Sequence, residues 1–147
     1  MFKINEKVIY PAHGVCQVSN IVVRSIGKTE KEFYVLKTGQ VTLIVPTDEN
    51  VIRPIASQDE IKEAIDFANN GEVKIDNSTW NRRYRNYIEL LKSGQIKDVA
   101  LVYRSLKVLQ LNKDLSFGER KMLDCAKELL QTEIEAAGVD SQFSLSA

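Results

Sequence analysis

Up to residue 54 the hydrophobic residues come in short runs that end at Gly, Pro, Asn or Asp. Runs rich in Val, Ile, Tyr and Phe with such boundaries are typical of β-strands. The pattern predicts five short strands, at residues 7–10, 15–23, 32–37, 41–45 and 51–53. Five strands in about fifty residues are too few for a sandwich, so they favour a small, strongly bent barrel of the SH3 or Tudor-like type. Modules of this kind usually bind a partner and rarely catalyse a reaction.

After residue 54 the apolar residues recur with the period of an α-helix. Capping boxes at residues 57–60 and 116–119 mark the starts of two helices. The pattern predicts four helices: one from the first capping box to residue 70, one from residue 77 or 78 to 94, one at 96–109 and one at 116–138. Their expected inward stripes are Ile61, Ala64, Ile65 and Ala68; Tyr84, Tyr87, Ile88 and Leu91; Val99, Ala100, Tyr103 and Leu106; and Met122, Ala126, Leu129 and Leu130.

Strands followed by helices, without alternation, indicate two domains and not a single α/β sheet. We therefore expect an α+β chain with a five-stranded β-barrel at residues 1–55 and an all-α helical bundle at residues 56–138. Residues 139–147 have few apolar side chains to bury, so we expect a frayed tail there.

The composition is that of an ordinary globular protein, since 44% of the 147 residues are hydrophobic and 27% are charged. No apolar run approaches the ~20 residues that cross a bilayer, and the first residues lack the apolar region of a signal peptide. We expect a cytoplasmic protein that has no membrane partner.

Few residues offer catalytic or metal chemistry, because the chain has two Cys and one His, whereas a structural zinc site needs four such ligands. Cys16 and Cys125 are interpreted as reduced, packed side chains. His13 lies three residues before Cys16, but the turn-like pattern around it favours a role in backbone geometry and capping. The sequence has no Gly-rich phosphate loop, HExxH helix or Rossmann fingerprint. We therefore expect no enzyme, no metal and no cofactor.

The charges balance overall but are distributed unevenly. The 20 basic and 20 acidic residues give a net charge of zero, which argues against tight binding of nucleic acid by charge alone. Residues 78–121 nevertheless carry a net charge of +6, whereas 55–77 and 122–147 carry −4 each and 1–54 carry +2. The basic charge is therefore concentrated in one internal block.

The strongest local feature of this block is the segment WNRRYR at residues 80–85, with three Arg and two aromatic residues. Arg82 and Arg85 lie about 60° apart on a helix, on the side opposite the predicted apolar stripe. Guanidinium forks suit phosphate oxygens, and the amides of a helix N-terminus add to the attraction. The alternative is a solvated helix face. Arg120 and Lys121, with residues 112–114, extend the basic surface if the bundle brings them together.

Trp80 has two interpretations. Helical geometry places it within about 40° of Tyr84, which favours a core position. It also falls in the first turn, where a side chain can overhang the end of the packed stripe. An exposed tryptophan beside arginines suits stacking on a base or wedging at a base step.

Seven short motifs stand in the same order as in a known protein family. They are YPAHGV (10–15), YVL (34–36), VP (45–46), WNRRYR (80–85), KSG (92–94), VALVYRSL (99–106) and LSFGERKML (115–123). In these motifs the chain resembles the CarD family of bacterial transcription regulators, which includes the CdnL proteins. The resemblance covers nearly the whole chain, on both sides of the predicted domain boundary.

The resemblance implies a Tudor-like domain that binds the β subunit of bacterial RNA polymerase at its β1 lobe. It also implies a helical domain that contacts promoter DNA, largely independently of sequence, at the upstream edge of the transcription bubble. There the tryptophan that matches Trp80 enters the minor groove and neighbouring basic residues hold phosphates, which stabilises the open complex in transcription initiation. The DNA-binding residues implied in this way are Trp80, Arg82, Arg83 and Arg85, with Arg120 and Lys121.

For the polymerase contact the resemblance points to Arg24 and to the position of Ile44. Arg24 matches one basic contact of the barrel, whereas Ile44 stands where the family commonly has a second basic residue. Cys16 stands where a small residue usually follows the His-Gly-Val turn. These departures concern the affinity for polymerase and leave the class of protein unchanged.

The leading hypothesis is a monomeric transcription factor that bridges polymerase and promoter. One alternative is a protein–protein interaction adaptor, in which the barrel binds one partner and the arginine-rich helix face binds another protein without contacting DNA. A second alternative is a small hydrolase that uses His13 and Cys16.

Overall fold

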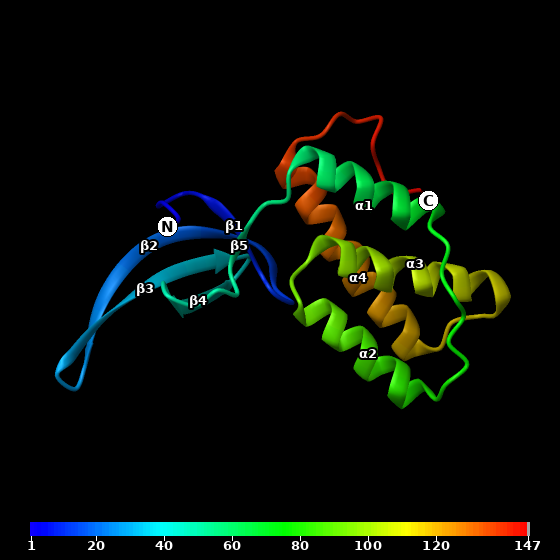
Figure 1. Ribbon diagram of the computed structural model, residues 1–147, viewed down its shortest axis with the longest axis horizontal. Coiled ribbons are helices and arrows are strands. Elements are labelled where there is room, and N and C mark those ends of the chain that lie inside the picture. The colour runs from blue at the N-terminus through cyan, green and yellow to red at the C-terminus, as the bar shows by residue number, and fades with distance from the viewer. Residues whose placement is uncertain (147) are drawn as a thin grey trace.

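The computed structural model describes residues 1–146, and in this part of the chain five strands precede four helices (Figure 1). The strands are β1 (Lys7–Tyr10), β2 (Gly14–Ile26), β3 (Thr29–Thr38), β4 (Val41–Pro46) and β5 (Arg53–Pro54). The helices are α1 (Gln58–Asn70), α2 (Trp80–Lys92), α3 (Ile96–Asn112) and α4 (Phe117–Ala137). The sheet and the helices form two adjoining units along the long axis of the molecule.

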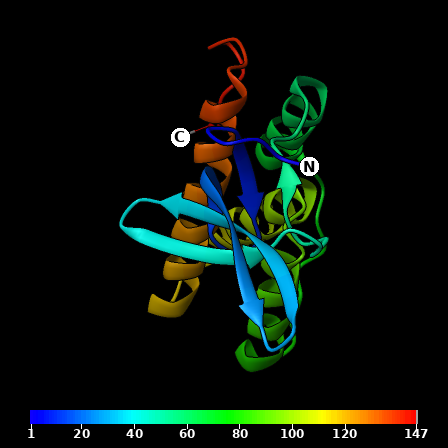
Figure 2. The same cartoon turned by 90° about the vertical axis from the view of Figure 1, so that its left-hand side faces the viewer.

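The five strands form one antiparallel sheet in the order β4-β3-β2-β1-β5. Seen along the long axis, this sheet lies in front of the helices (Figure 2). The predicted β-barrel is therefore confirmed as a five-stranded sheet, but not as a closed barrel. β4 and β5 stand at the two ends of the strand order, and no pairing among the described residues joins them. With only two residues, β5 offers little backbone for a further pairing.

The β2–β3 hairpin is longer than the sequence pattern predicts. Residues 15–23 and 32–37 were expected to be strands, but pairing continues to the tip, where Ile26 opposes Thr29. Gly27 has a φ of 63° in the two-residue turn, a conformation that glycine adopts without strain. The outer part of this ribbon is exposed on both faces, so its sequence does not alternate between apolar and polar residues. Its strand character therefore comes from cross-strand hydrogen bonds and not from a buried face.

One face of the sheet carries a small core of its own. Tyr34 and Leu36 of β3 point into it, and Tyr34 also accepts a hydrogen bond at its hydroxyl from the amide of Phe2, 3.1 Å away. The buried members are Val8, Cys16, Val18, Tyr34, Leu36, Val45 and Ile52. The sequence analysis predicted the strands but did not predict which of their residues are buried.

The helices pack around α3, which contacts α1, α2 and α4. The expected inward residues of α1 and α3 are all buried, as are Met122, Ala126 and Leu130 of α4. In α2 the prediction is right for Tyr87 and Leu91 but wrong for Tyr84, which is 45% exposed. None of the helices in residues 1–146 has an apolar stretch long enough to span a membrane.

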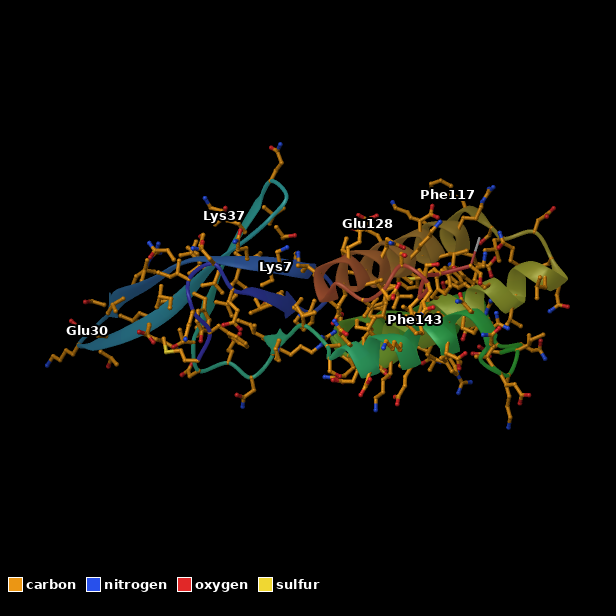
Figure 3. The ribbon with its side chains drawn as sticks, turned by 90° about the horizontal axis from the view of Figure 1, so that it is seen from above. Lys7, Glu30, Lys37, Phe117, Glu128 and Phe143 are labelled. Atoms are coloured by element: carbon orange, nitrogen blue, oxygen red, sulfur yellow. The ribbon has the colours of Figure 1, made fainter. Side chains whose placement is uncertain are left out.

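We expected a frayed tail at residues 139–147; residues 139–146 pack against the helices, and residue 147 lies outside the described residues. After Gly138, whose left-handed backbone ends α4, the chain folds back along α1 (Figure 1). The aromatic ring of Phe143 packs against the helical core and lies 4.7 Å from the Lys62 amine (Figure 3). The Asn69 amide group donates to the Ser144 carbonyl and accepts from the Ser146 amide. Three apolar side chains in the tail, at 139, 143 and 145, were enough to hold it.

Candidate nucleic-acid interface

The N-terminal ends of α2 and α4 lie together at one end of the helical unit (Figure 1). The indole of Trp80, the first residue of α2, rests against Gly118 in the first turn of α4. A Cβ added at Gly118 would lie 3.3 Å from Cζ2 of Trp80, so the absence of a side chain there makes room for the ring. Both capping residues, Thr79 and Ser116, accept hydrogen bonds from amides of the first turns. The positive ends of two helix dipoles therefore meet at this surface.

Trp80 is half-buried, so each of the two interpretations of its position is partly right. One side of the indole packs edge-on against Tyr84, with ring centroids 5.6 Å apart, and against the buried Tyr87 at 6.5 Å. The guanidinium carbon of Arg83 lies 5.4 Å from the indole centroid. The side chain of Trp80 remains partly accessible, since it is neither fully buried nor fully exposed. A ring that is held by its neighbours and stays partly accessible is suited to stacking on a flat partner.

Beneath Trp80, Glu119 forms a buried charge network. Its carboxylate is only 1% exposed and accepts hydrogen bonds from Arg83 Nη1 at 3.0 Å and Lys113 Nζ at 2.8 Å. It also accepts from the Ser116 amide at 2.9 Å, which completes the capping box of α4. Burial alone raises the pKa of Glu119, but the bonds from Lys113, Ser116 and Arg83 outweigh it and lower the pKa to about 2.

The network separates Arg83 from the other arginines of α2. Its side chain is only 12% exposed, and its charge is balanced by Glu119. Arg82 and Arg85 are exposed, as their helical positions predicted. Arg120 and Lys121 are exposed in the first turn of α4. The structure thus brings the basic residues of both helices to the same end of the bundle, with Arg83 placed to support Trp80 more than to face solvent.

The sequence analysis missed one exposed aromatic residue at this end. Phe117, the first residue of α4, is 76% exposed and points away from the bundle (Figure 3). A signal was present, because at 100° per residue Phe117 lies about 140° from Met122, on the side opposite the buried stripe. Leu111, at the end of α3, is also exposed. Phe117 therefore adds an exposed aromatic side chain to the basic end of the bundle.

Comparison with known proteins identifies the family. A model of the CarD C-terminal domain matches residues 63–142, and a model of the CarD-like/TRCF RID domain matches residues 2–56. The chain belongs to the CarD/CdnL family. It is also 29% identical over 140 residues to a Bacillus subtilis (strain 168) protein named "Putative transcription factor YdeB", covering 92% of this chain and 91% of that protein.

In this CarD-family chain Arg24 and Ile44 lie on one face of the sheet. Ile44 of β4 pairs with Val35, which pairs with Asn20 of β2, and paired residues share a face. Arg24 lies four residues further along β2 than Asn20, about 13 Å from it, and therefore, by alternation, on this same face. Both side chains are exposed. This outer face is opposite the sheet core and away from the helix ends that carry Trp80.

The CarD-family turn at residues 10–15 does not form a catalytic site. Cys16 is 1% exposed, its thiol donates to the Gly14 carbonyl at 3.6 Å, and burial raises its pKa. A nucleophilic thiol needs the opposite shift and an open path to substrate. The His13 ring lies against Tyr10 instead, 5.5 Å between centroids. The interpretation of both cysteines as packed is right for Cys16 and wrong for Cys125, which is exposed on α4.

Proposed function

We propose that this protein, a transcription regulator of the CarD/CdnL family, bridges RNA polymerase and promoter DNA and stabilises the open complex. The observation that carries the proposal is the partly exposed side chain of Trp80, which lies at the paired helix N-termini with exposed Arg82, Arg85, Arg120 and Lys121. The sheet would bind the β subunit at its β1 lobe through the face that carries Arg24 and Ile44. The match of residues 2–56 to a CarD-like/TRCF RID domain supports this second contact.

The sheet face that carries Arg24 and Ile44 and the helix ends that carry Trp80 lie in different units, which suits a bridging role. Figure 3 places Glu30, at the tip of the β2–β3 hairpin, at one end of the long axis and Phe117 toward the other. A protein docked on polymerase through the sheet would present Trp80 to nearby DNA. That DNA contact is then effectively intramolecular, so a surface with little affinity for free duplex can still act. The zero net charge of the chain is compatible with this arrangement.

The indole would act by preferring one state of the promoter. Stacking of an aromatic ring on a base is worth roughly 1–3 kcal/mol. A ring that gains this energy only when the duplex edge has opened shifts the open–closed equilibrium by about 5- to 150-fold. The phosphate contacts of the arginines are formed in both states, so they would position the protein without selecting one.

A footprint of the polymerase–promoter complex tests the proposal. We expect added protein to protect DNA at the upstream edge of the bubble and to leave the downstream edge unchanged. A DNA-free adaptor, the alternative considered above, would leave the upstream footprint as it is with polymerase alone. That result, obtained with protein bound to the polymerase, would contradict the proposed DNA contact.

The sheet contact makes a separate prediction for Arg24. Replacing Arg24 by Glu reverses an exposed charge, and like charges at an interface are unfavourable. We expect the affinity for the isolated β subunit to fall on the order of tenfold or more, with a weakened salt dependence. Binding can be measured by biolayer interferometry at two salt concentrations. Lys28→Glu at the hairpin turn is the matched charge reversal, and an Arg24 variant no weaker than this control would remove Arg24 from the interface.

A further inference from the structure

The two units contact each other through close backbone approaches. The turn between β1 and β2 lies against the loop between α2 and α3, where a Cβ at Gly94 would come within 2.9 Å of Pro11 Cγ. At the start of β2, a Cβ at Gly14 would come within 3.0 Å of Leu129 Cδ2 on α4. Both glycines have positive φ values, 73° and 78°, which L side chains rarely adopt. These contacts bring the units together, but apolar contacts are non-directional, so they do not by themselves fix the angle between the units.

A buried ion pair between β5 and α4 restricts rotation of one unit against the other. The guanidinium of Arg53 donates through Nη1 and Nη2 to the two carboxylate oxygens of Glu133, both at 2.7 Å. Their side chains are 18% and 5% exposed. Arg53 Nε donates to the carbonyl of Gly94, and the Glu133 carboxylate also accepts from the amide of Ala56, 2.9 Å away. The pair therefore connects β5, the interdomain linker, the α2–α3 loop and α4.

The geometry of the Arg53–Glu133 pair fixes the orientation of β5 relative to α4 as well as the distance between them. Two parallel hydrogen bonds between a planar fork and a planar carboxylate oppose rotation about the line that joins them. The bond that Nε donates to the Gly94 carbonyl reaches a different element and blocks a further rotation. Arg53 is held in the sheet, because Ile9 of β1 pairs with it. Only residues 55–57 separate β5 from α1, so the short linker limits how far the two units can move apart.

We propose that Arg53 and Glu133 form an interdomain clamp, which holds the helical unit at one angle to the sheet and thereby determines where Trp80 meets promoter DNA. The second part rests on the proposed function, because it needs the sheet to be docked on polymerase. Without the clamp, the sheet and the helices keep their own cores, and only their mutual angle changes. Arg53 and Glu133 are thus positioning residues that touch neither polymerase nor DNA.

The angle can be measured on the full chain with two spin labels. Cys125 is exposed on α4 and Cys16 is buried, so Lys28→Cys at the hairpin turn adds one further accessible thiol. We expect a narrow distribution of distances between labels at 28 and 125. In the Glu133→Gln background, which loses the charge and one acceptor oxygen, we expect a broad distribution. Arg53→Lys keeps the charge but not the fork, and provides a second variant with an intermediate width.

Function is read as the lifetime of open promoter complexes with the unlabelled full chain. If the orientation that engages DNA is populated only part of the time, the apparent stabilisation falls by that fraction. We expect Glu133→Gln to shorten the lifetime about 3- to 10-fold, while affinities for polymerase alone and for forked DNA alone stay unchanged. Glu128→Gln on the exposed side of α4 is the matched control and should change neither the distances nor the lifetime.

A narrow distance distribution in a folded Glu133→Gln protein would overturn the clamp. So would a broad distribution combined with an unchanged open-complex lifetime, provided that Trp80→Ala shortens the lifetime in the same assay. If Trp80→Ala has no effect either, the proposed function has failed, and the distance measurement still decides whether the clamp exists. Circular dichroism spectra and urea unfolding of each variant separate a changed angle from a lost fold.

Discussion

Open promoter complexes formed with a Trp80→Ala variant are expected to dissociate about 5- to 150-fold faster than those formed with the original chain. This range corresponds to the loss of roughly 1–3 kcal/mol of base stacking that exists only in the open state. Affinity for RNA polymerase should not change, since Trp80 lies on the helical unit and not on the sheet. Lifetimes can be measured by competitor challenge, with the variant at a concentration that saturates polymerase.

The half-buried setting of Trp80 requires controls for stability and for loss of apolar surface. Trp80→Phe keeps a ring against Tyr84 and Gly118, so it should retain an intermediate lifetime. Ile4→Ala removes an exposed apolar side chain before β1, away from the helix ends, and should leave the lifetime unchanged. A well-folded Trp80→Ala protein that binds polymerase and supports normal lifetimes would show that the indole serves packing alone.

Replacing Glu119 by Gln is expected to lower the free energy of unfolding at pH 7 by about 3 kcal/mol. The variant leaves Arg83 and Lys113 without the carboxylate that balances them, and breaking one side of a buried ion pair costs about 3–5 kcal/mol. The retained amide oxygen places the expected loss at the lower end of this range. Urea unfolding followed by tryptophan fluorescence is a direct measurement, because Trp80 is the one tryptophan of the chain and lies beside Arg83.

The contribution of Glu119 to the free energy of unfolding depends on pH with a defined sign. The pKa of Glu119 is lowered from its ordinary 4.5 to about 2 in the folded protein, so ionisation of this carboxylate stabilises the fold. The stabilisation is complete above about pH 5 and is lost as the pH falls toward 2, and it amounts to about 3 kcal/mol. The difference in unfolding free energy between the original chain and Glu119→Gln should therefore shrink over this interval. Parallel curves would show that the network does not lower the pKa of this carboxylate.

Glu60 provides a matched control, since it holds the same third position in the capping box of α1. Its side chain is exposed, and no salt bridge joins it to another described residue. Hydrogen bonds from the backbone and hydroxyl of Ser57 lower its pKa as well. Glu60→Gln should nevertheless lower the unfolding free energy by no more than about 1 kcal/mol, as is usual for an exposed cap. A loss as large as that of Glu119→Gln would mean that capping, and not charge burial, explains both.

Local pattern was sufficient for most of the elements. Runs of β-favouring residues bounded by turn residues predicted the strands, and the period of 3.6 with the capping boxes predicted the helices and the buried faces of α1 and α3. The errors arose where contacts with residues outside the local segment decide whether a side chain is buried. Tyr84 lies at the border of an apolar stripe, and a neighbouring ring, Trp80, decides how much of it is covered. The tail was expected to fray because its own apolar residues are few, but a surface of α1 and the bundle was available to receive them.

The sequence by itself determined the change from strands to helices, the family motifs and the exposure of Arg82 and Arg85, because each depends on residues within a few positions of one another. Only the tertiary structure decided that Glu119, 36 positions from Arg83, takes that guanidinium out of the exposed basic surface. It also decided that Glu133 reaches Arg53 across 80 positions and joins the two units. Charge pairing across such separations depends on how helices and sheet pack, and neither residue type nor spacing encodes it.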